Sequence, residues 1–160
     1  MNTSTLLNVL KTDEQLSALP LRVVAGILFI AHGAQKLFAW FGGYGLEGTG
    51  QWMESIGLAP GYLMALMAGS AEFFGGIFLL VGLLTRPTAV ALAFTMLVAI
   101  FAVHFQNGLF MSNNGYEFAL SLFAISVSLV FQGGGKFSLD RVLTSKLTSQ
   151  GKAQLQTASN

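Results

Sequence analysis

Four ionisable side chains interrupt apolar stretches of this sequence at helical spacing, and a fifth stands at the head of another such stretch. They are His32, Lys36, Glu72, His104 and Glu117. Hydrocarbon solvates charge poorly, so ionisable groups inside segments long enough to cross a membrane indicate a functional site by default. Histidine and carboxylate groups can relay protons when burial tunes them, and a carboxylate can pair with a lysine. The set therefore predicts a buried polar site for proton transfer, for ion pairing, or for both.

The elements that must position these side chains are four apolar segments, near residues 21–41, 62–84, 87–106 and 116–132. Each approaches the roughly 20 residues that a helix needs to cross a hydrocarbon core, and lipid leaves such a segment only the helical conformation. Hydrophobic residues make up 53% of the 160 residues and charged residues only 9%. A soluble domain carries about a quarter charged residues. The sequence predicts an all-α integral membrane four-helix bundle.

We divide the chain into an N-terminal tail (1–19), a four-span domain (20–132) and a C-terminal tail (133–160). Lysine and arginine lie in both tails and in the turn at Arg86, whereas the loops 42–61 and 107–115 contain neither. The positive-inside rule then predicts that both termini are cytoplasmic.

The two tails carry weaker patterns. The first nineteen residues lack the pattern of a cleavable signal, so we expect the first span to remain as an anchor. Leucine and valine recur at helical spacing over residues 139–147, with basic residues among them. That pattern predicts an amphipathic helix on the anionic inner leaflet, followed by a disordered end.

Alternating helix direction places all five ionisable side chains in the central or outer half of the membrane. His32 and Lys36 lie four residues apart and share one helix face. Glu72 falls within about 2 Å of the centre of its span, and His104 lies about 11 Å toward the outside. Glu117 reaches a similar outer level. We therefore expect one polar cluster.

Glu72 is predicted to face another helix. Ala68, Glu72 and Gly76 form a row at four-residue spacing, and rows of small residues let membrane helices approach closely. The natural counter-charge is His32 or Lys36, because an unpaired carboxylate at this depth would take up a proton.

The same residues allow structural interpretations. Lys36 could extend to the outer interface, and Glu117 could lie among headgroups. A pair between Glu72 and a basic residue of the first span could fasten the bundle without any chemistry. Two histidines suggest a bis-histidine haem, but their depths differ by about 9–10 Å, which argues against it.

Other residues have secondary or structural roles in this interpretation. Gln35 and Asn107 are secondary site candidates. Arg22 is expected to anchor the first span at the interface, Arg86 to determine topology, and Gly75 and Gly76 to allow close helix packing.

Composition excludes several classes of protein. Without cysteine there is no disulfide, no thiolate nucleophile and no cysteine-ligated zinc or iron–sulfur cluster. We predict no metal site. A net charge of +1 without a basic run gives no reason to expect nucleic acid. The glycine pattern at residues 43–48 follows a membrane helix rather than a strand, so it is not a dinucleotide-binding loop.

Several separated motifs resemble those of the DoxX family of small membrane proteins. Residues 32–38 (HGAQKLF) resemble the family's HGxxKLF signature in the first span. Glu72 with Gly75 and Gly76, followed by GLLTR at 82–86, resembles its E-x-x-GG…GLxTR stretch. The GGG…SLD segment at 133–140 is similar to the family's GPG…SLD ending, with Gly134 in place of proline.

The resemblance implies a four-helix protein of the prokaryotic plasma (inner) membrane. The family takes its name from membrane subunits of archaeal thiosulfate:quinone oxidoreductase, and other members resemble partners in thiol and oxidative-stress systems. It therefore implies a membrane subunit of a redox system that is quinone-linked, or acts on sulfur and thiols or in oxidative stress. It leaves the cofactor open, with a quinone as one candidate and nothing covalently bound. The positions that match are His32, Lys36, Glu72 and Glu117, without assigned catalytic roles.

Two other functions stay open. The chain could be a non-catalytic membrane anchor or assembly partner, or a small-solute or proton carrier that acts as an oligomer. Besides the lipid bilayer, we expect a protein partner or a second copy of the chain. The lack of cysteine and of soluble-cofactor motifs favours a subunit over a self-contained enzyme.

Overall fold

The structure, a computed structural model, describes residues 3–10, 12 and 16–158, and throughout these residues the regular elements are helices. The principal helices are α1 (Thr3–Leu10), α2 (Ala18–Phe38), α3 (Gly45–Ser55), α4 (Gly61–Val81), α5 (Thr85–Val98), α6 (Glu117–Gln132) and α7 (Leu139–Ala158). Three apolar helices, Ala18–Phe38, Gly61–Val81 and Thr85–Asn107, are long enough to cross a membrane, and α6 is a shorter apolar helix. The predicted all-α membrane fold is confirmed.

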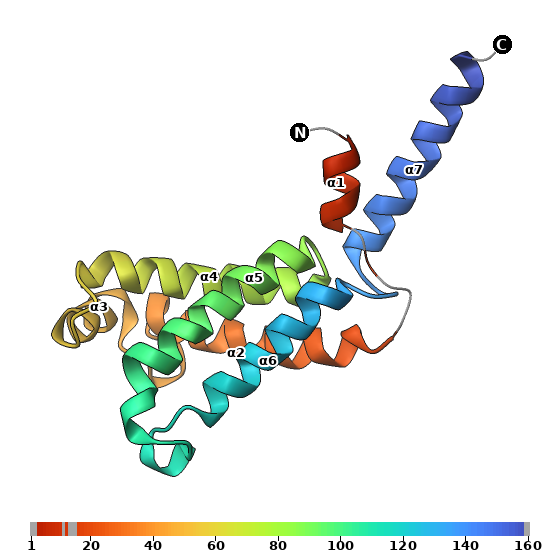
Figure 1. Cartoon of the computed structure of the whole chain (residues 1–160). Helices are drawn as coiled ribbons and strands as arrows, with labels where there is room; N and C mark the ends of the chain where they lie inside the picture. Colours follow the sequence, from red (N-terminus) through yellow and green to blue (C-terminus); the bar gives the residue numbers. More distant parts are fainter. Residues whose placement is uncertain (1–2, 11, 13–15, 159–160) are drawn as a thin grey trace.

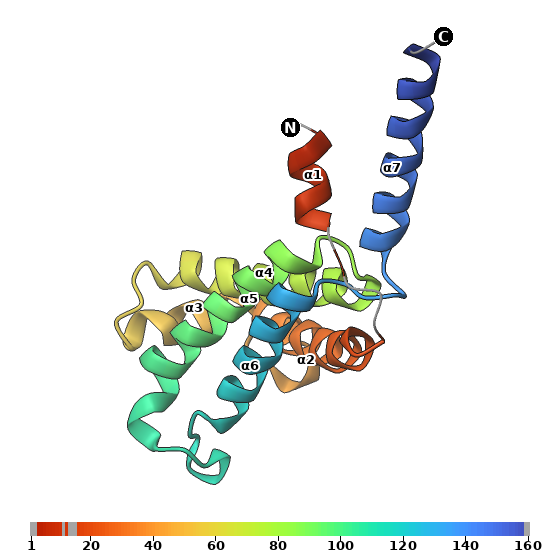
Figure 2. The same ribbon diagram turned by 45° about the vertical axis from the view of Figure 1, so that its right-hand side comes forward.

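The spans form two helix pairs, α2 with α4 and α5 with α6 (Figure 1). The pairs meet at the end that carries α1, α7 and the Gly82–Thr85 turn, which we call the termini end. They diverge toward the opposite end, which carries α3 and residues 105–116 and which we call the loop end (Figure 2). The helix axes of the two pairs are therefore farthest apart at the loop end.

Glycines let α2 and α4 pack backbone against backbone. A Cβ atom on Gly26 would lie 2.9 Å from the carbonyl oxygen of Gly76. A Cβ atom on Gly33 would lie 2.8 Å from the carbonyl oxygen of Gly69 and 2.7 Å from the Cα atom of Phe73. These distances are shorter than a carbon–oxygen or carbon–carbon contact allows. Only glycine fits at these crossing points, as in other closely packed membrane helices.

The small-residue stripe of α4 differs slightly from the predicted one. The structure buries Ala65, Gly69, Glu72 and Gly76, while Ala68 is half-buried. Alternating spacings of four and three residues follow the true helical period of 3.6, whereas a strict four-residue row drifts off the face. Glu72 lies in the stripe as expected.

The adjacent glycines face different neighbours. Gly76 meets α2, whereas a Cβ atom on Gly75 would lie 3.2 Å from the side chain of Leu92 on α5. Together they give α4 a smooth surface toward both helices, which is the packing role that the sequence suggested. Large apolar side chains, among them Phe29, Leu79 and Leu129, fill the core between the two pairs.

Asp140, which lies just inside α7, caps the first turn of α5. Its carboxylate accepts hydrogen bonds from the backbone N–H groups of Leu84 (2.7 Å) and Thr85 (2.9 Å). The N–H group of Asp140 itself donates to the carbonyl oxygen of Gly82 at 2.9 Å. A carboxylate at a helix N-terminus satisfies donors that the helix leaves free and interacts favourably with the helix dipole. The segment after the last span is thereby tied to the turn between α4 and α5.

Arg22, which we expected to anchor the first span at the interface, is buried under that same segment. Its side chain is 1% exposed, and Nη2 donates to the carbonyl oxygen of Phe137 at 2.6 Å. The difference arises because residues 137–140 fold back over the start of α2, which the positions of the charges alone do not reveal. Arg86 also binds the chain after the last span, through a hydrogen bond to the carbonyl oxygen of Phe131 at 2.8 Å.

Helices extend further into the tails and loops than we expected. The hydroxyl of Ser138 accepts a hydrogen bond from the N–H group of Arg141, so it caps α7, which continues to Ala158 rather than ending near residue 147. Thr144 of α7 donates to the carbonyl oxygen of Leu10 in α1. α7 runs across the direction of α2 and α4 rather than along it. In the loop 42–61, α3 covers Gly45–Ser55. Parts of the tails (1–2, 11, 13–15 and 159–160) lie outside the described residues.

We predict that Gly33→Val destabilises the protein by at least about 2 kcal/mol, because the new side chain would overlap the backbone of α4. The melting temperature of the purified protein in detergent should fall by about 4–8 °C. Ala91→Val adds two methyl groups at an exposed position of α5 and serves as the control. Equal melting temperatures for the two variants would contradict the close packing of α2 and α4.

We predict that Asp140→Asn loosens α7, because an amide provides one acceptor oxygen where the carboxylate provides two. Loss of a helix cap costs about 1 kcal/mol. Limited trypsin digestion should therefore cleave at Arg141 and Lys146 faster in this variant. Ser145→Ala, at an exposed position of the same helix, should cleave at the wild-type rate. Unchanged cleavage of Asp140→Asn would show that the cap does not hold the segment.

Candidate functional site

An ion pair between α2 and α4 forms the centre of the candidate site. Lys36 Nζ lies 2.6 Å from Glu72 Oε2, and the two side chains are 23% and 4% exposed. Lys36 Nζ also lies 3.5 Å from the carbonyl oxygen of His32. The glycine contacts between the helices bring the two side chains within this distance. Of the two counter-charges that the sequence allowed for Glu72, Lys36 makes the ion pair.

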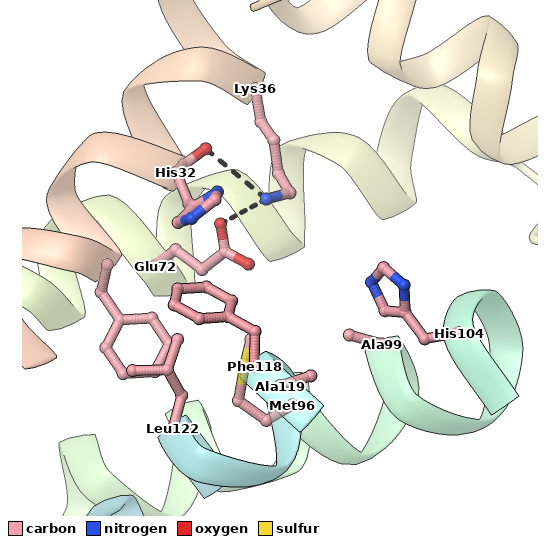
Figure 3. A pocket seen from close by; sticks show the side chains of 10 residues that line it. His32, Lys36, Glu72, Met96, Ala99, His104, Phe118, Ala119 and Leu122 are labelled. Carbon is pink, nitrogen blue, oxygen red and sulfur yellow. Dashed lines mark hydrogen bonds and ion pairs between the residues drawn. The ribbon is translucent and has the colours of Figure 1, made fainter. Parts of the chain in front are cut away.

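A cavity of about 100 Å³ adjoins this pair, between the two helix pairs. Its polar lining comes from His32, Lys36, Glu72 and His104. Its apolar lining comes from Phe29, Met96, Ala99, Phe118, Ala119 and Leu122. Figure 3 shows these side chains pointing into one space from both helix pairs. Four of the five ionisable candidates thus line one pocket.

His32 forms part of the wall rather than the ion pair. Its ring centroid lies 5.5 Å from that of Phe118 on α6, with the ring planes tilted by 51°. Aromatic pairs at this separation and tilt attract each other through their ring quadrupoles. His32 therefore joins α2 to α6 across the cavity while its imidazole faces the pocket.

His104 reaches the pocket because α5 widens into a π-helical turn (η2) over Ala99–His104. In a regular α-helix, residues five apart point roughly 140° away from each other, so Ala99 and His104 could not face one space. In a π-helical turn the hydrogen bonds run from residue i to residue i+5, which aligns such a pair. Both residues line the pocket.

The remaining sequence candidates lie around the pocket and not in it. Glu117 Oε1 accepts a hydrogen bond from the N–H group of Met111 at 2.6 Å and so orders the loop before α6. Gln35 Nε2 donates to the carbonyl oxygen of Phe41 at 3.2 Å. Asn107 Nδ2 donates to the carbonyl oxygen of Asn114 at 3.2 Å. All three hold backbone segments at the loop end.

Sequence reasoning missed the apolar half of the pocket and the carbonyl group of Asn114. Phe118 and Met96 look like any lipid-facing or packing residue in the sequence, so no signal separates them from their neighbours. Asn114 lies in a loop, and its backbone contribution depends on how that loop folds.

The arrangement offers one ammonium–carboxylate pair, two imidazoles and an apolar cavity. The cavity, at about 100 Å³, is smaller than the apolar cavity of about 150 Å³ that encloses a benzene molecule, so a ring bound here would lie only partly inside it. Over the described residues, no group of three or more histidine, cysteine or acidic side chains could hold a metal ion. The site thus combines hydrogen-bonding and proton-accepting side chains with an apolar wall.

Fold and site together define a class: a small multi-pass helical membrane protein with a polar pocket between its spans. The chain belongs to the DoxX family, whose pattern it matches over residues 17–105. The predicted family is confirmed.

The chain is similar to several bacterial proteins over most of its length. It is 36% identical to the Escherichia coli "Inner membrane protein YqjF" over 143 residues, which cover 86% of this chain and 99% of the relative. It is 36% identical to the Bacillus subtilis "Putative oxidoreductase CatD" over 115 residues, 72% of this chain and 79% of the relative. It is 31% identical to the Mycobacterium tuberculosis "Uncharacterized membrane protein Rv3486" over 146 residues, which cover 84% of this chain and 86% of the relative. No solved structure matches the chain.

These similarities and the apolar helices indicate the same cellular location for the chain. It is a multi-pass protein of the prokaryotic inner membrane, as predicted, and its apolar helices contact the lipid bilayer.

We predict that Lys36→Met destabilises the protein by about 3 kcal/mol, because it leaves the carboxylate of Glu72 buried without its partner. The double variant Lys36→Met/Glu72→Gln should recover most of this loss, since neither charge then remains. Thermal unfolding in detergent measures the stability of the single and the double variant. Lys146→Met, at an exposed position of α7, serves as the control. A double variant less stable than the single one would contradict the ion pairing.

Proposed function

We propose that this protein is an integral membrane subunit of a redox system, and that its pocket binds a quinone or another small redox-active molecule. The observation that carries the proposal is the cavity bounded by His32, His104 and the Lys36–Glu72 pair within membrane-spanning helices. Quinone chemistry consumes and releases protons, and imidazole and carboxylate groups can relay them. The name of the Bacillus subtilis relative includes "oxidoreductase", which supports a redox role.

We further propose that the termini end faces the cytoplasm and the loop end faces outward. The loops at the loop end contain no lysine or arginine, whereas basic residues gather at the termini end. With this orientation the pocket lies in the outer half of the membrane.

The protein has no cysteine to carry electrons, and the described residues offer no metal cluster. We therefore assign electron transfer to the bound molecule and to a partner chain. The chain's own residues bind the ring, hold it between apolar walls and move protons at its edge.

The second candidate function is a membrane anchor or assembly partner without chemistry. The short distance between Lys36 Nζ and Glu72 Oε2 favours it, because such a pair can fasten two helices. Under this alternative, variants of the pair would change abundance or partner binding rather than the content of the pocket. A carrier that acts as an oligomer stays a third possibility without an observation that favours it.

Mass spectrometry of the protein gently purified from its own membrane tests the proposal. We expect a quinone or similar ring compound to be retained by the wild type and lost in Glu72→Gln and in His32→Ala at matched abundance. Glu47→Gln, the same change at an exposed position of α3, should retain it. A protein that carries stoichiometric partner chains but no ring compound, unchanged by these variants, would overturn the redox proposal and favour the anchor.

A further inference from the structure

The imidazole of His104 is held in one orientation by the backbone of the neighbouring loop. Its Nδ1 atom lies 2.8 Å from the carbonyl oxygen of Asn114. A carbonyl oxygen can only accept, so Nδ1 carries the proton and donates it. Asn107 Nδ2 donates to the same oxygen at 3.2 Å. In the neutral ring the other nitrogen, Nε2, is therefore left with a lone pair and can only accept.

The π-helical turn directs this ring toward the pocket. His104 lines the cavity together with Ala99, and Figure 3 shows its imidazole on the wall opposite His32, Lys36 and Glu72. Asn114 supports the ring from the loop side. The same geometry, a backbone carbonyl bound to Nδ1 with Nε2 facing a ligand, orients histidines at metal and catalytic sites.

The opposite wall of the pocket supplies a hydrogen-bond donor. A lysine ammonium has three N–H bonds, and Lys36 directs hydrogen bonds to Glu72 Oε2 and the carbonyl oxygen of His32. In the described part of the chain these are its two partners, which leaves one N–H bond for a ligand oxygen. The pocket thus has an acceptor at the His104 wall, a donor at the Lys36 wall and an apolar-lined space of about 100 Å³ between them, which would hold part of one ring.

We propose that this pocket selects the hydroxyl-bearing form of a single aromatic ring, a hydroquinone or related phenol, over its oxidised or methylated form. One hydroxyl donates to His104 Nε2, and an oxygen on the other side of the ring accepts from Lys36 Nζ. A quinone carbonyl or a methoxy oxygen cannot donate, so it would place a lone pair against the lone pair of Nε2. This inference rests on the proposed function and adds which redox form the site holds.

Binding of three matched rings to the full-length protein in lipid nanodiscs tests the inference. The probes are 1,4-dihydroxybenzene, 4-methoxyphenol and 1,4-dimethoxybenzene, measured anaerobically by calorimetry. A lost hydrogen bond corresponds to roughly a fivefold loss of affinity. We expect the dihydroxy and monohydroxy compounds to bind at least about fivefold more tightly than the dimethoxy compound. The variant His104→Phe, which keeps an aromatic ring but removes the acceptor, should make the three affinities equal.

Each outcome decides the inference. Equal affinities of the three rings for the wild type would overturn it, and this comparison does not depend on any variant folding. A preference for the hydroxylated rings that persists in His104→Phe would also overturn it, because another group would then be the acceptor. Failure of all three rings to bind would overturn it as well. The proposed function stands or falls separately, on whether a native ring compound is lost in Glu72→Gln.

Discussion

The close approach of α2 and α4 is the constraint on which the rest of this structure depends. Gly26 and Gly33 of one helix meet Gly69 and Gly76 of the other at distances that exclude any side chain. At this separation the side chain of Lys36 reaches Glu72 directly, so the carboxylate can remain buried with a partner. α5 and α6 pack as a second pair, which meets α4 at Gly75. The pocket forms where the two pairs diverge.

The pocket also depends on departures from regular helix at the loop end. The π-helical turn moves His104 onto the same face as Ala99, and the loop that follows presents the carbonyl group of Asn114 to its ring. Asn114 itself adopts a left-handed conformation with φ of 59°, which asparagine tolerates better than most residues. Glu117 fixes this loop through the N–H group of Met111. One wall of the site is thus a rigid ion pair, and the other is a histidine supported by an ordered loop.

The sequence predicted the fold well because apolar length and charge are strong signals in a membrane protein. It placed Glu72 in a row of small residues, and the structure pairs it with one of the two expected partners. It could not tell whether His104 and Glu117 meet the same cavity, because depth along a straight helix says nothing about a π-helical turn. The burial of Arg22 was not predicted, for a similar reason. Its burial depends on a segment 115 residues later in the chain, and local pattern carries no information about such a contact.

The hydrogen bond between Arg22 and Phe137 can form only after all four spans have been synthesised. Arg22 Nη2 has one partner, the carbonyl oxygen of Phe137, while Nε and Nη1 are buried without a hydrogen bond among the described residues. Phe137 follows the last span, so a ribosome must have made all four spans before this oxygen exists. Until then the guanidinium at the start of α2 lacks this carbonyl and is solvated by water or lipid headgroups. A chain that stops early, or whose last span fails to insert, therefore leaves the Arg22 guanidinium without this backbone partner at the termini end.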